Sequence, residues 1–542
     1  MQLRTITLAT LGAVFASGAF AQMTSFPKPN YFRETFLKAQ TKVQLKDPVH
    51  LSDFVVGGKL ELSLKNYLTL VMSNNTDIQL QLLTVEQPKN AITRAFGTFD
   101  PTARASFTST HTTSPSTNAL DGTTTGAVTQ TSQPASFSFS QFMETGTQYT
   151  ATYSAAKTTT SSSFATYNPA LTSNLAISVS QPLLRNRGSE VNRLPIMTAK
   201  SRLAISEFNL RGQVLNLISA AENAYWDLVS ARESLKVAVG ARDVAAAFLK
   251  LSEKQLELGA LSPLDIYNPQ QQLATNELSV SQATFNLQQK EDVLRKQMGV
   301  DLDPQTRALP IQLTETVDIA GNAASIDRDQ AISRAMANRP DLKSAIQSLD
   351  VDDLAIKSAK NGLMPNLALT GNYTTQGRGG IFFPQGKAFV PGGYPDAVSQ
   401  MFGFGFPVYG FGLNLSLPIK SRAAAADMAD ALIAKKRDAL NIRTTQQTVR
   451  LDILNAISNV AGSQEQLKLA KLARDFAVKN LDSENKKYEL GTEINQNVIL
   501  AQNALVQAES NVVVNQIGLR RNLLNLLTKT GELLDERGIV IQ

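Results

Sequence analysis

The sequence predicts a mixed fold, in which a membrane β-barrel is joined to a long α-helical coiled coil, with this plan built twice in one chain. Three observations indicate it. Two parts of the 542-residue chain repeat each other. Long proline-free stretches carry apolar residues at heptad spacing. Short segments alternate apolar with polar residues, as half-buried strands do.

The first 21 residues are typical of a secretory signal. Arg4 precedes an apolar stretch, and Ala19-Phe20-Ala21 matches the small-x-small cleavage pattern. We expect residues 22–60 to form an N-terminal extension. The chain has no cysteine, so we expect no lipid anchor on an N-terminal cysteine, and the two histidines, His50 and His111, lack metal-ligand spacing. No cofactor, metal or catalytic residue is expected.

The repeat appears in two gapless alignments. Leu62–Pro101 aligns with Ile326–Pro365 at an offset of 264, and Arg211–Gly299 aligns with Arg443–Gly531 at an offset of 232. The first copy therefore has 32 more residues between its two helical parts. We expect a first repeat at 61–299, a linker at 300–325, a second repeat at 326–531 and a C-terminal tail at 532–542.

Each repeat is expected to contain three helical stretches. They are 63–95, 195–258 and 262–298 in the first repeat, and 327–361, 420–489 and 493–530 in the second. In the long helix of the first repeat, a heptad seam runs through Leu210, Val214, Leu217, Ala221 and onward to Ala238. Ile218, Tyr225 and Val229 begin a second stripe, so this helix should contact neighbours on two sides. A proline at position 269 should bend or restart the third helix.

Strand patterns fall in two regions, 102–183 and 366–418. Four segments alternate apolar with small or polar residues: 103–107, 175–179, 367–373 and 411–417. Four strands cannot close a membrane barrel alone, so the barrel must be shared between chains. The Ser/Thr-dense stretches 108–133 and 157–166 are expected to be solvated loops. Phe137 and Phe139, followed by Tyr149 and Tyr153, suggest a further hairpin in the first copy.

Three short motifs add a resemblance to these patterns. They are Gln181-Pro182-Leu183-Leu184, the stretch from Leu258 to Asp265, and Tyr488-Glu489-Leu490-Gly491-Thr492. Together with the duplication, they make the chain resemble the TolC family of outer-membrane efflux proteins from about residue 60 to 534. The resemblance implies a homotrimer with a 12-stranded barrel, to which each chain gives four strands, above a coiled-coil tunnel in the periplasm.

The family resemblance also implies a function. Such a channel is the exit duct of a tripartite efflux or type I secretion system. It docks on a periplasmic adaptor (membrane fusion) protein, which an inner-membrane pump serves, and it converts nothing chemically. The adaptor contacts are expected at the two tips where the long helices turn: Leu258, Gly259, Ala260, Leu261 and Ser262 at the first, and Leu490, Gly491 and Thr492 at the second.

The resemblance further places a gate at these tips. Asp265 and Tyr488 fall where the family has a hydrogen-bonded pair, so a bond between them is our gating hypothesis. The simpler alternative is that Asp265 serves the start of a helix and Tyr488 only packs. Glu493 and Asn497 stand where some members have an arginine and an aspartate, and this departure puts an aspartate ring in doubt.

A second functional interpretation remains. A structural or adhesive trimeric coiled-coil protein of the cell surface would explain the heptads, although not the paired strand regions. An enzyme is disfavoured because no nucleophile elbow, phosphate loop or paired-carboxylate motif stands out. The formal charge of +6 is spread along the chain without a basic block, which disfavours nucleic-acid binding. The transported substrate and the class of pump are left open.

Overall fold

The computed structural model describes residues 54–116, 126–259, 261–299, 309–315, 327–382, 389–490 and 492–541. The chain divides into two compact units, Met1–Asp47 and Pro48–Gln542, and every described residue belongs to the second. The expected signal at 1–21 and most of the expected extension and linker lie outside the described residues. So do Ala260 and Gly491 of the expected tips.

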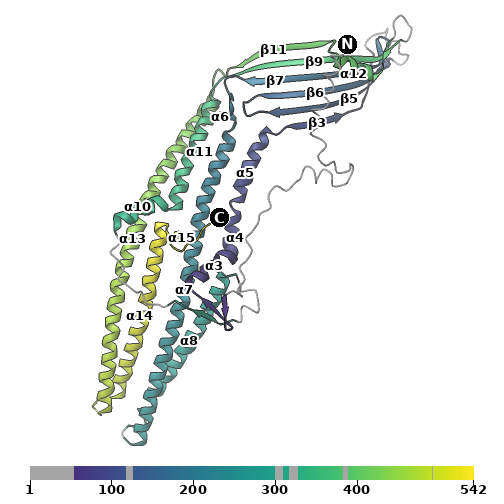
Figure 1. Cartoon of the computed structure of the whole chain (residues 1–542). Coiled ribbons are helices and arrows are strands. Elements are labelled where there is room, and N and C mark those ends of the chain that lie inside the picture. Colours follow the sequence, from purple (N-terminus) through teal and green to yellow (C-terminus); the bar gives the residue numbers. More distant parts are fainter. Residues whose placement is uncertain are drawn as a thin grey trace. The chain divides into compact units, whose positions relative to one another are not determined.

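The helices follow the duplicated order that the sequence predicts (Figure 1). The first repeat contains α3 (Leu64–Asn74), α4 (Thr76–Leu83), α5 (Glu86–Phe96), α6 (Ser189–Asn192), α7 (Leu194–Glu257) and α8 (Tyr267–Gln297). The second repeat contains α10 (Arg328–Asn338), α11 (Pro340–Gly362), α12 (Tyr394–Phe402), α13 (Arg422–Glu489) and α14 (Asn495–Thr530), and α15 (Leu533–Glu536) follows it. None of the helices in the described part of the chain is both long and apolar enough to cross a membrane.

The two long helices are confirmed. α7 has 64 residues and α13 has 68, so at ~1.5 Å per residue each is about 100 Å long. Both expected stripes of α7 are buried at their centres, where Val214, Ala221 and Leu228 belong to one and Ile218 and Tyr225 to the other. α7 packs against α8, α11 and α14, and Tyr225 of the second stripe lies against Tyr67 of α3.

The shorter helices are more broken than the sequence predicts. The expected helix 63–95 is three helices. The first break lies at Asn75, which caps α4 by accepting hydrogen bonds from the backbone N–H groups of Asp77 and Ile78. The expected helix 327–361 is two, and Pro340 opens the second of them. The helix expected from residue 262 begins five residues later, at Tyr267.

Equivalent contacts in the two repeats support the duplication. Gly299 follows α8 with φ of 67°, and Gly531 follows α14 with φ of 77°. A Cβ atom on Gly299 would lie 2.5 Å from the carbonyl oxygen of Asn74, and one on Gly531 would lie 3.2 Å from the carbonyl carbon of Asn338. Asn74 and Asn338 are themselves aligned in the repeat. Each glycine is therefore needed both for its left-handed turn and for close approach.

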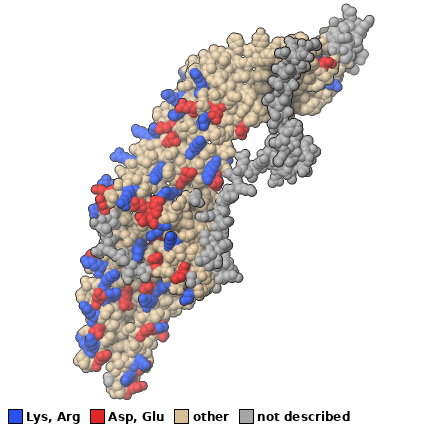
Figure 2. Space-filling view, viewed as in Figure 1, with Lys and Arg blue, Asp and Glu red and all other residues tan. Residues whose placement is uncertain are grey.

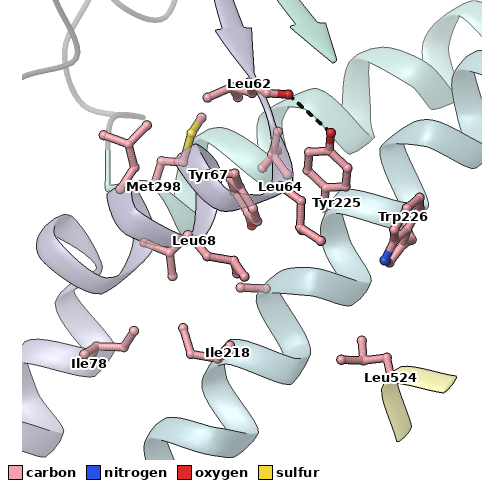
Figure 3. Close-up of a cluster of buried hydrophobic side chains, with 14 of the residues drawn as sticks. Leu62, Leu64, Tyr67, Leu68, Ile78, Ile218, Tyr225, Trp226, Met298 and Leu524 are labelled. Atoms are coloured by element: carbon pink, nitrogen blue, oxygen red, sulfur yellow. Dashed lines mark hydrogen bonds between the residues drawn. The ribbon is translucent and has the colours of Figure 1, made fainter. Parts of the chain in front are cut away.

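The main core lies where α3, α4 and α7 meet a small sheet (Figure 3). This sheet has β1 (Val55–Val56), β2 (Lys59–Leu62) and β8 (Ile311–Leu313), in the order β1-β2-β8. The ring centroids of Tyr67 and Tyr225 are 5.6 Å apart, and the Tyr225 hydroxyl donates to the Leu62 carbonyl over 3.2 Å. The stretch expected as a C-terminal tail joins this core, since Leu533 and Leu534 of α15 are buried in it.

A large antiparallel sheet links the two repeats. Its strands are β3 (Thr102–Phe107), β4 (Thr110–Pro115), β5 (Ala127–Phe142), β6 (Gln148–Thr160), β7 (Tyr167–Pro182), β9 (Asn366–Phe382), β10 (Phe389–Gly392) and β11 (Pro407–Ser416). The order is β10-β9-β7-β6-β5-β3, with β4 also beside β5 and β11 also beside β9. Because β3 and β4 share one edge and β10 and β11 share the other, the eight strands fill six positions across the sheet.

The expectation of four strands per chain is therefore wrong. The additional pair is the β5–β6 hairpin, which Phe137, Phe139, Tyr149 and Tyr153 had suggested. The expectation of solvated loops is wrong for residues 110–115, 127–133 and 157–160, which belong to β4, β5 and β6, whereas residues 161–166 form a loop between β6 and β7, as expected. Threonine favours strands, and in these segments both faces are polar, so the alternating pattern is missing.

The sheet has one apolar and one polar face near the helices. Odd-numbered positions supply the apolar face, including Phe137, Ala151, Ile177, Leu369 and Phe411. Even-numbered positions supply the polar face, including Ser138, Thr150, Ser178 and Asn372. The surface seen in Figure 2 is largely uncharged over the sheet, whereas the helices carry many charges of both signs.

Helix α12 covers part of the apolar face. Ala397 and Met401 are buried against β7 and β9, and the Thr375 hydroxyl donates to the Met401 carbonyl over 2.7 Å. Gly377 allows this contact, because a Cβ atom there would lie 1.8 Å from the carbonyl oxygen of Ala397. The helix backbone thus rests directly on the strand.

Candidate gate at the helical tips

Each repeat ends its long helical pair in a tight tip. α7 ends at Glu257 and α13 at Glu489, and each is followed by an exposed leucine, Leu258 and Leu490. Gly259 has a φ of 76°, which explains a glycine at this turn. Of the expected adaptor contacts, Leu258, Gly259, Leu261, Ser262, Leu490 and Thr492 are described, and all but the half-buried Leu261 are exposed.

Pro269 explains how the first tip is built. It lacks the backbone N–H that would bond to the carbonyl of Asp265 four residues earlier, so a helix starting at residue 262 would lose that bond. α8 instead starts at Tyr267, and residues 263–266 form a turn in which the Asp265 N–H donates to the Ser262 carbonyl. The proline thus restarts the helix rather than bending it.

The unused carbonyl of Asp265 is bound by the other repeat. The side-chain amide of Asn495, at the start of α14, donates to it over 3.0 Å, and the Asn495 side chain is nearly buried. Further along, the Gln272 amide donates to the Asn503 side-chain oxygen over 2.7 Å. Neutral amides therefore link the tips of the two repeats, and Asn495 was not among the expected site residues.

Tyr488 lies in a small apolar cluster. Phe248, Leu481, Val498, Ile499 and Ala501 complete it, so residues of both repeats meet there. The Tyr488 ring centroid is 5.4 Å from that of Phe248, and the side chain is only 6% exposed. Within the described residues the Tyr488 hydroxyl is buried without a hydrogen-bonding partner. The expected Tyr488–Asp265 hydrogen bond is therefore not formed in this structure.

Glu493 and Asn497 act together at the start of α14. One Glu493 carboxylate oxygen accepts from the Ile494 backbone N–H over 3.1 Å and from the Asn497 amide over 2.6 Å. The hydrogen bond from the Ile494 backbone N–H, and then the one from the Asn497 side-chain amide, hold the pKa of Glu493 below its usual value. These two residues brace the turn, and Lys487 nearby pairs with Glu484 at 2.6 Å.

A charged cluster holds the α10–α11 junction of the second repeat. Arg339 donates to Asp341 over 2.6 and 3.0 Å and to Asp452 of α13 over 3.0 Å, and Lys529 of α14 donates to Asp452 over 3.1 Å. The first repeat has Asn75 and Gln297 at the positions aligned with Arg339 and Lys529. The Asn75 amide donates to the Gln297 backbone carbonyl over 2.8 Å and to the Gln297 side-chain oxygen over 3.2 Å. The first repeat keeps an aspartate, Asp77, where the second has Asp341, but it has neutral residues where the second has Arg339 and Lys529, so the network of ion pairs belongs to the second copy.

Acid should loosen the charged junction specifically. Burial alone would raise the pKa of Asp341 and Asp452, but the hydrogen bonds from Arg339, and from Lys529 to Asp452, outweigh burial and lower both values. The stabilisation is complete above the unfolded aspartate pKa of about 3.9 and is lost as pH falls through the lower folded values. We expect the thermal midpoint, followed by helical circular dichroism, to fall as the pH drops below about 4. Asp452→Asn should make the thermal midpoint depend less on pH in this range. If this variant loses stability in acid as steeply as the unmodified protein, the charged junction is not what acid loosens.

Comparison with known proteins places this architecture. Residues 331–532 match the family model described as "Outer membrane efflux protein". The cobalt-zinc-cadmium resistance protein CzcC of Cupriavidus metallidurans is 26% identical over 161 residues, covering 27% of this chain and 37% of CzcC. The match therefore spans little more than a third of that curated relative.

Solved structures share the fold over most of the chain. The CmeC outer membrane channel of Campylobacter jejuni superposes with a TM-score of 0.59 and 16% identity, covering 87% of this chain and 86% of CmeC. The MtrE outer membrane channel of Neisseria gonorrhoeae, in its open state, superposes with a TM-score of 0.59 and 13% identity, covering 92% of this chain and 96% of MtrE. The predicted resemblance to TolC-like outer membrane efflux proteins is confirmed.

Proposed function

We propose that this chain is the exit duct of a tripartite efflux or type I secretion system. Three copies would carry substrates across the outer membrane from an inner-membrane pump and a periplasmic adaptor. The observation that supports this most is the two-faced sheet, whose apolar positions can contact lipid and whose polar positions can line water. The charged helices that continue from it suit the aqueous periplasm. The sheet disfavours the alternative of a purely structural or adhesive coiled coil, which needs no such face.

Planar-bilayer recording tests the proposal. The purified full-length protein should give stepwise conductance and should migrate as an oligomer in SDS until heated. Neither behaviour is expected of a coiled-coil rod, so the absence of both would refute the channel.

Pull-down of a periplasmic adaptor should depend on the tips, and exchanging the exposed Leu258 and Leu490 for aspartate should weaken it. The matching exchange of the exposed Leu278, on α8 away from the tip, is the control.

We further propose that the tips are the gate, and that Asn495 holds them together. Asn495→Ala removes the amide that binds the Asp265 carbonyl, so openings in planar bilayers should become more frequent or larger. Asn511→Ala, an exposed amide on the same helix, should have no effect. Equal behaviour of the two variants would remove Asn495 from the gate.

Tyr488→Phe separates packing from hydrogen bonding at the gate. The phenylalanine keeps the contact with Phe248 and deletes a hydroxyl that has no partner in this structure. A change in conductance would mean that the Tyr488 hydroxyl forms a hydrogen bond in another gating state. In that case Asp265→Ala should change the conductance in the same way. If both variants conduct like the unmodified protein, the hypothesis of a Tyr488–Asp265 bond fails and Tyr488 only packs.

A further inference from the structure

We propose that the two edges of the large sheet pair with each other between copies of this chain, so that three copies close a barrel of 18 strands. This proposal rests on the proposed three-copy channel and differs from the 12 strands expected from the sequence. It follows from the six positions across the sheet, of which the β5–β6 hairpin supplies two.

Both edges present unused backbone groups. Among the described strands, β3 and β4 pair only with β5, and β11 pairs only with β9. Every residue of β3 and β4 is exposed, as are all but one of β11, including Phe411 at 89%. β11 contains no charged residue, although charges are the usual protection of an open edge. In a lipid environment such edges must be paired, because each unsatisfied backbone group costs several kcal/mol there.

Strand direction favours a second copy as the partner. The six positions alternate in direction, since every pairing within the sheet is antiparallel. An even number of positions brings β3 of one copy beside β11 of the next in antiparallel orientation. An odd number would have forced a parallel pair at each junction.

The faces of the two edges also agree. In β3 the apolar side carries Ala103, Ala105 and Phe107, and in β11 it carries Tyr409 and Leu413. Both strands leave the sheet close to the helices, because β3 follows α5 and β11 leads into α13. Pairing them there continues one apolar band and one polar lining around the ring. Barrel diameter grows roughly linearly with strand number, so 18 strands would make a barrel about half again as wide as 12.

Cysteine cross-linking can read the strand order directly, because the natural chain has no cysteine. Ala105→Cys in β3 is combined in turn with cysteine at Phe411, Leu413 or Leu415 of β11, which samples three registers on one face. Under oxidation of the full-length protein in outer membranes, at least one combination should link copies into dimers and trimers. Ala151→Cys with Ile177→Cys, which are directly opposed in β6 and β7, should link within one copy.

The decisive control joins Ala105→Cys with Ile177→Cys. Two strands separate these positions in the six-position sheet, so no link should form, whereas a four-strand arrangement would place β3 beside β7. A link in this control, or no link between β3 and β11 in protein that conducts, would overturn the proposal and leave the channel function intact. Loss of all conductance in the unmodified protein would refute the channel instead.

Deleting residues 117–165 gives a second, independent readout. The deletion removes β5 and β6 and joins β4 to β7, so each copy would keep four positions, with β3 and β4 still filling one of them. The barrel should then admit only smaller polymers from the outer side, because barrel diameter grows with strand number. The largest polyethylene glycol that lowers the planar-bilayer current when added on that side should therefore be smaller for the deletion variant. An unchanged size limit in an assembled deletion variant would contradict an 18-stranded barrel, whatever the state of the tips.

Discussion

Replacing Arg537 with alanine should lower the free energy of unfolding of the helical part by about 3–5 kcal/mol, the usual cost of stranding a buried charge. Glu222, in the middle of α7, is only 1% exposed. Arg537 donates to its two carboxylate oxygens over 2.5 and 3.0 Å, and the Trp226 indole N–H lies 3.4 Å from one of them. Urea unfolding followed by helical circular dichroism would measure the loss.

Two variants make this test specific. Asp535→Asn removes the neighbouring ion pair with Arg211, in which the Arg211 side chain is 39% exposed and the Asp535 side chain 61%. It should lower the free energy of unfolding by less than about 1 kcal/mol. The double variant Glu222→Leu/Arg537→Leu removes both buried charges and should recover most of the stability. A loss in Arg537→Ala no larger than that in Asp535→Asn would show that the buried pair contributes little.

Gly377→Ala should have the second large effect, by displacing α12 from the sheet. The added Cβ atom would lie 1.8 Å from the Ala397 carbonyl oxygen, and both partners are backbone. We expect the added methyl group to destabilise the packed position of α12 on the sheet by about 3 kcal/mol, at the upper end for overpacked sites. A cysteine at Met401, which is fully buried, would report it: maleimide labelling should be slow in the parent and fast with Gly377→Ala.

Gly371→Ala is the matched control for this experiment. It lies on the same strand and face, and a Cβ atom there has nothing within 4 Å. Labelling at position 401 should stay slow. If the cysteine at position 401 is labelled equally slowly in Gly377→Ala, α12 adapts to the added methyl group without exposing its buried side. The glycine is then not required for the contact between α12 and the strand.

Periodicity explains what could be predicted from this sequence. Heptads such as that through Val214 and Leu228 identified the long helices, and gapless repetition placed the turns. The β5–β6 hairpin was only half recognised, because its apolar alternation at Phe137 and Tyr149 gives way to threonine and serine on both faces. α12 was missed because its nine residues lie between strands in a region read for alternation.

The tips show a different limit. The effect of Pro269 is local, since a missing N–H four residues after Asp265 can be read from sequence alone. Its partner is not local: Asn495 lies 230 positions away, and one asparagine gives no signal. The Tyr488–Asp265 bond was inferred from resemblance, which carries no information on the state of a tip. Arg537 stood in an apparent tail, and nothing in sequence marked it as the partner of Glu222.

The unequal strand content of the repeats has a consequence for symmetry. Both repeats supply one long helical pair, but four sheet positions come from the first repeat and two from the second. In the proposed three-copy assembly, the periplasmic end can present six nearly equivalent hairpins, whereas the outer rim can only be threefold. The passage must therefore change its rotational order where strands give way to helices. A partner at the tips would meet twice as many like surfaces as a ligand at the rim.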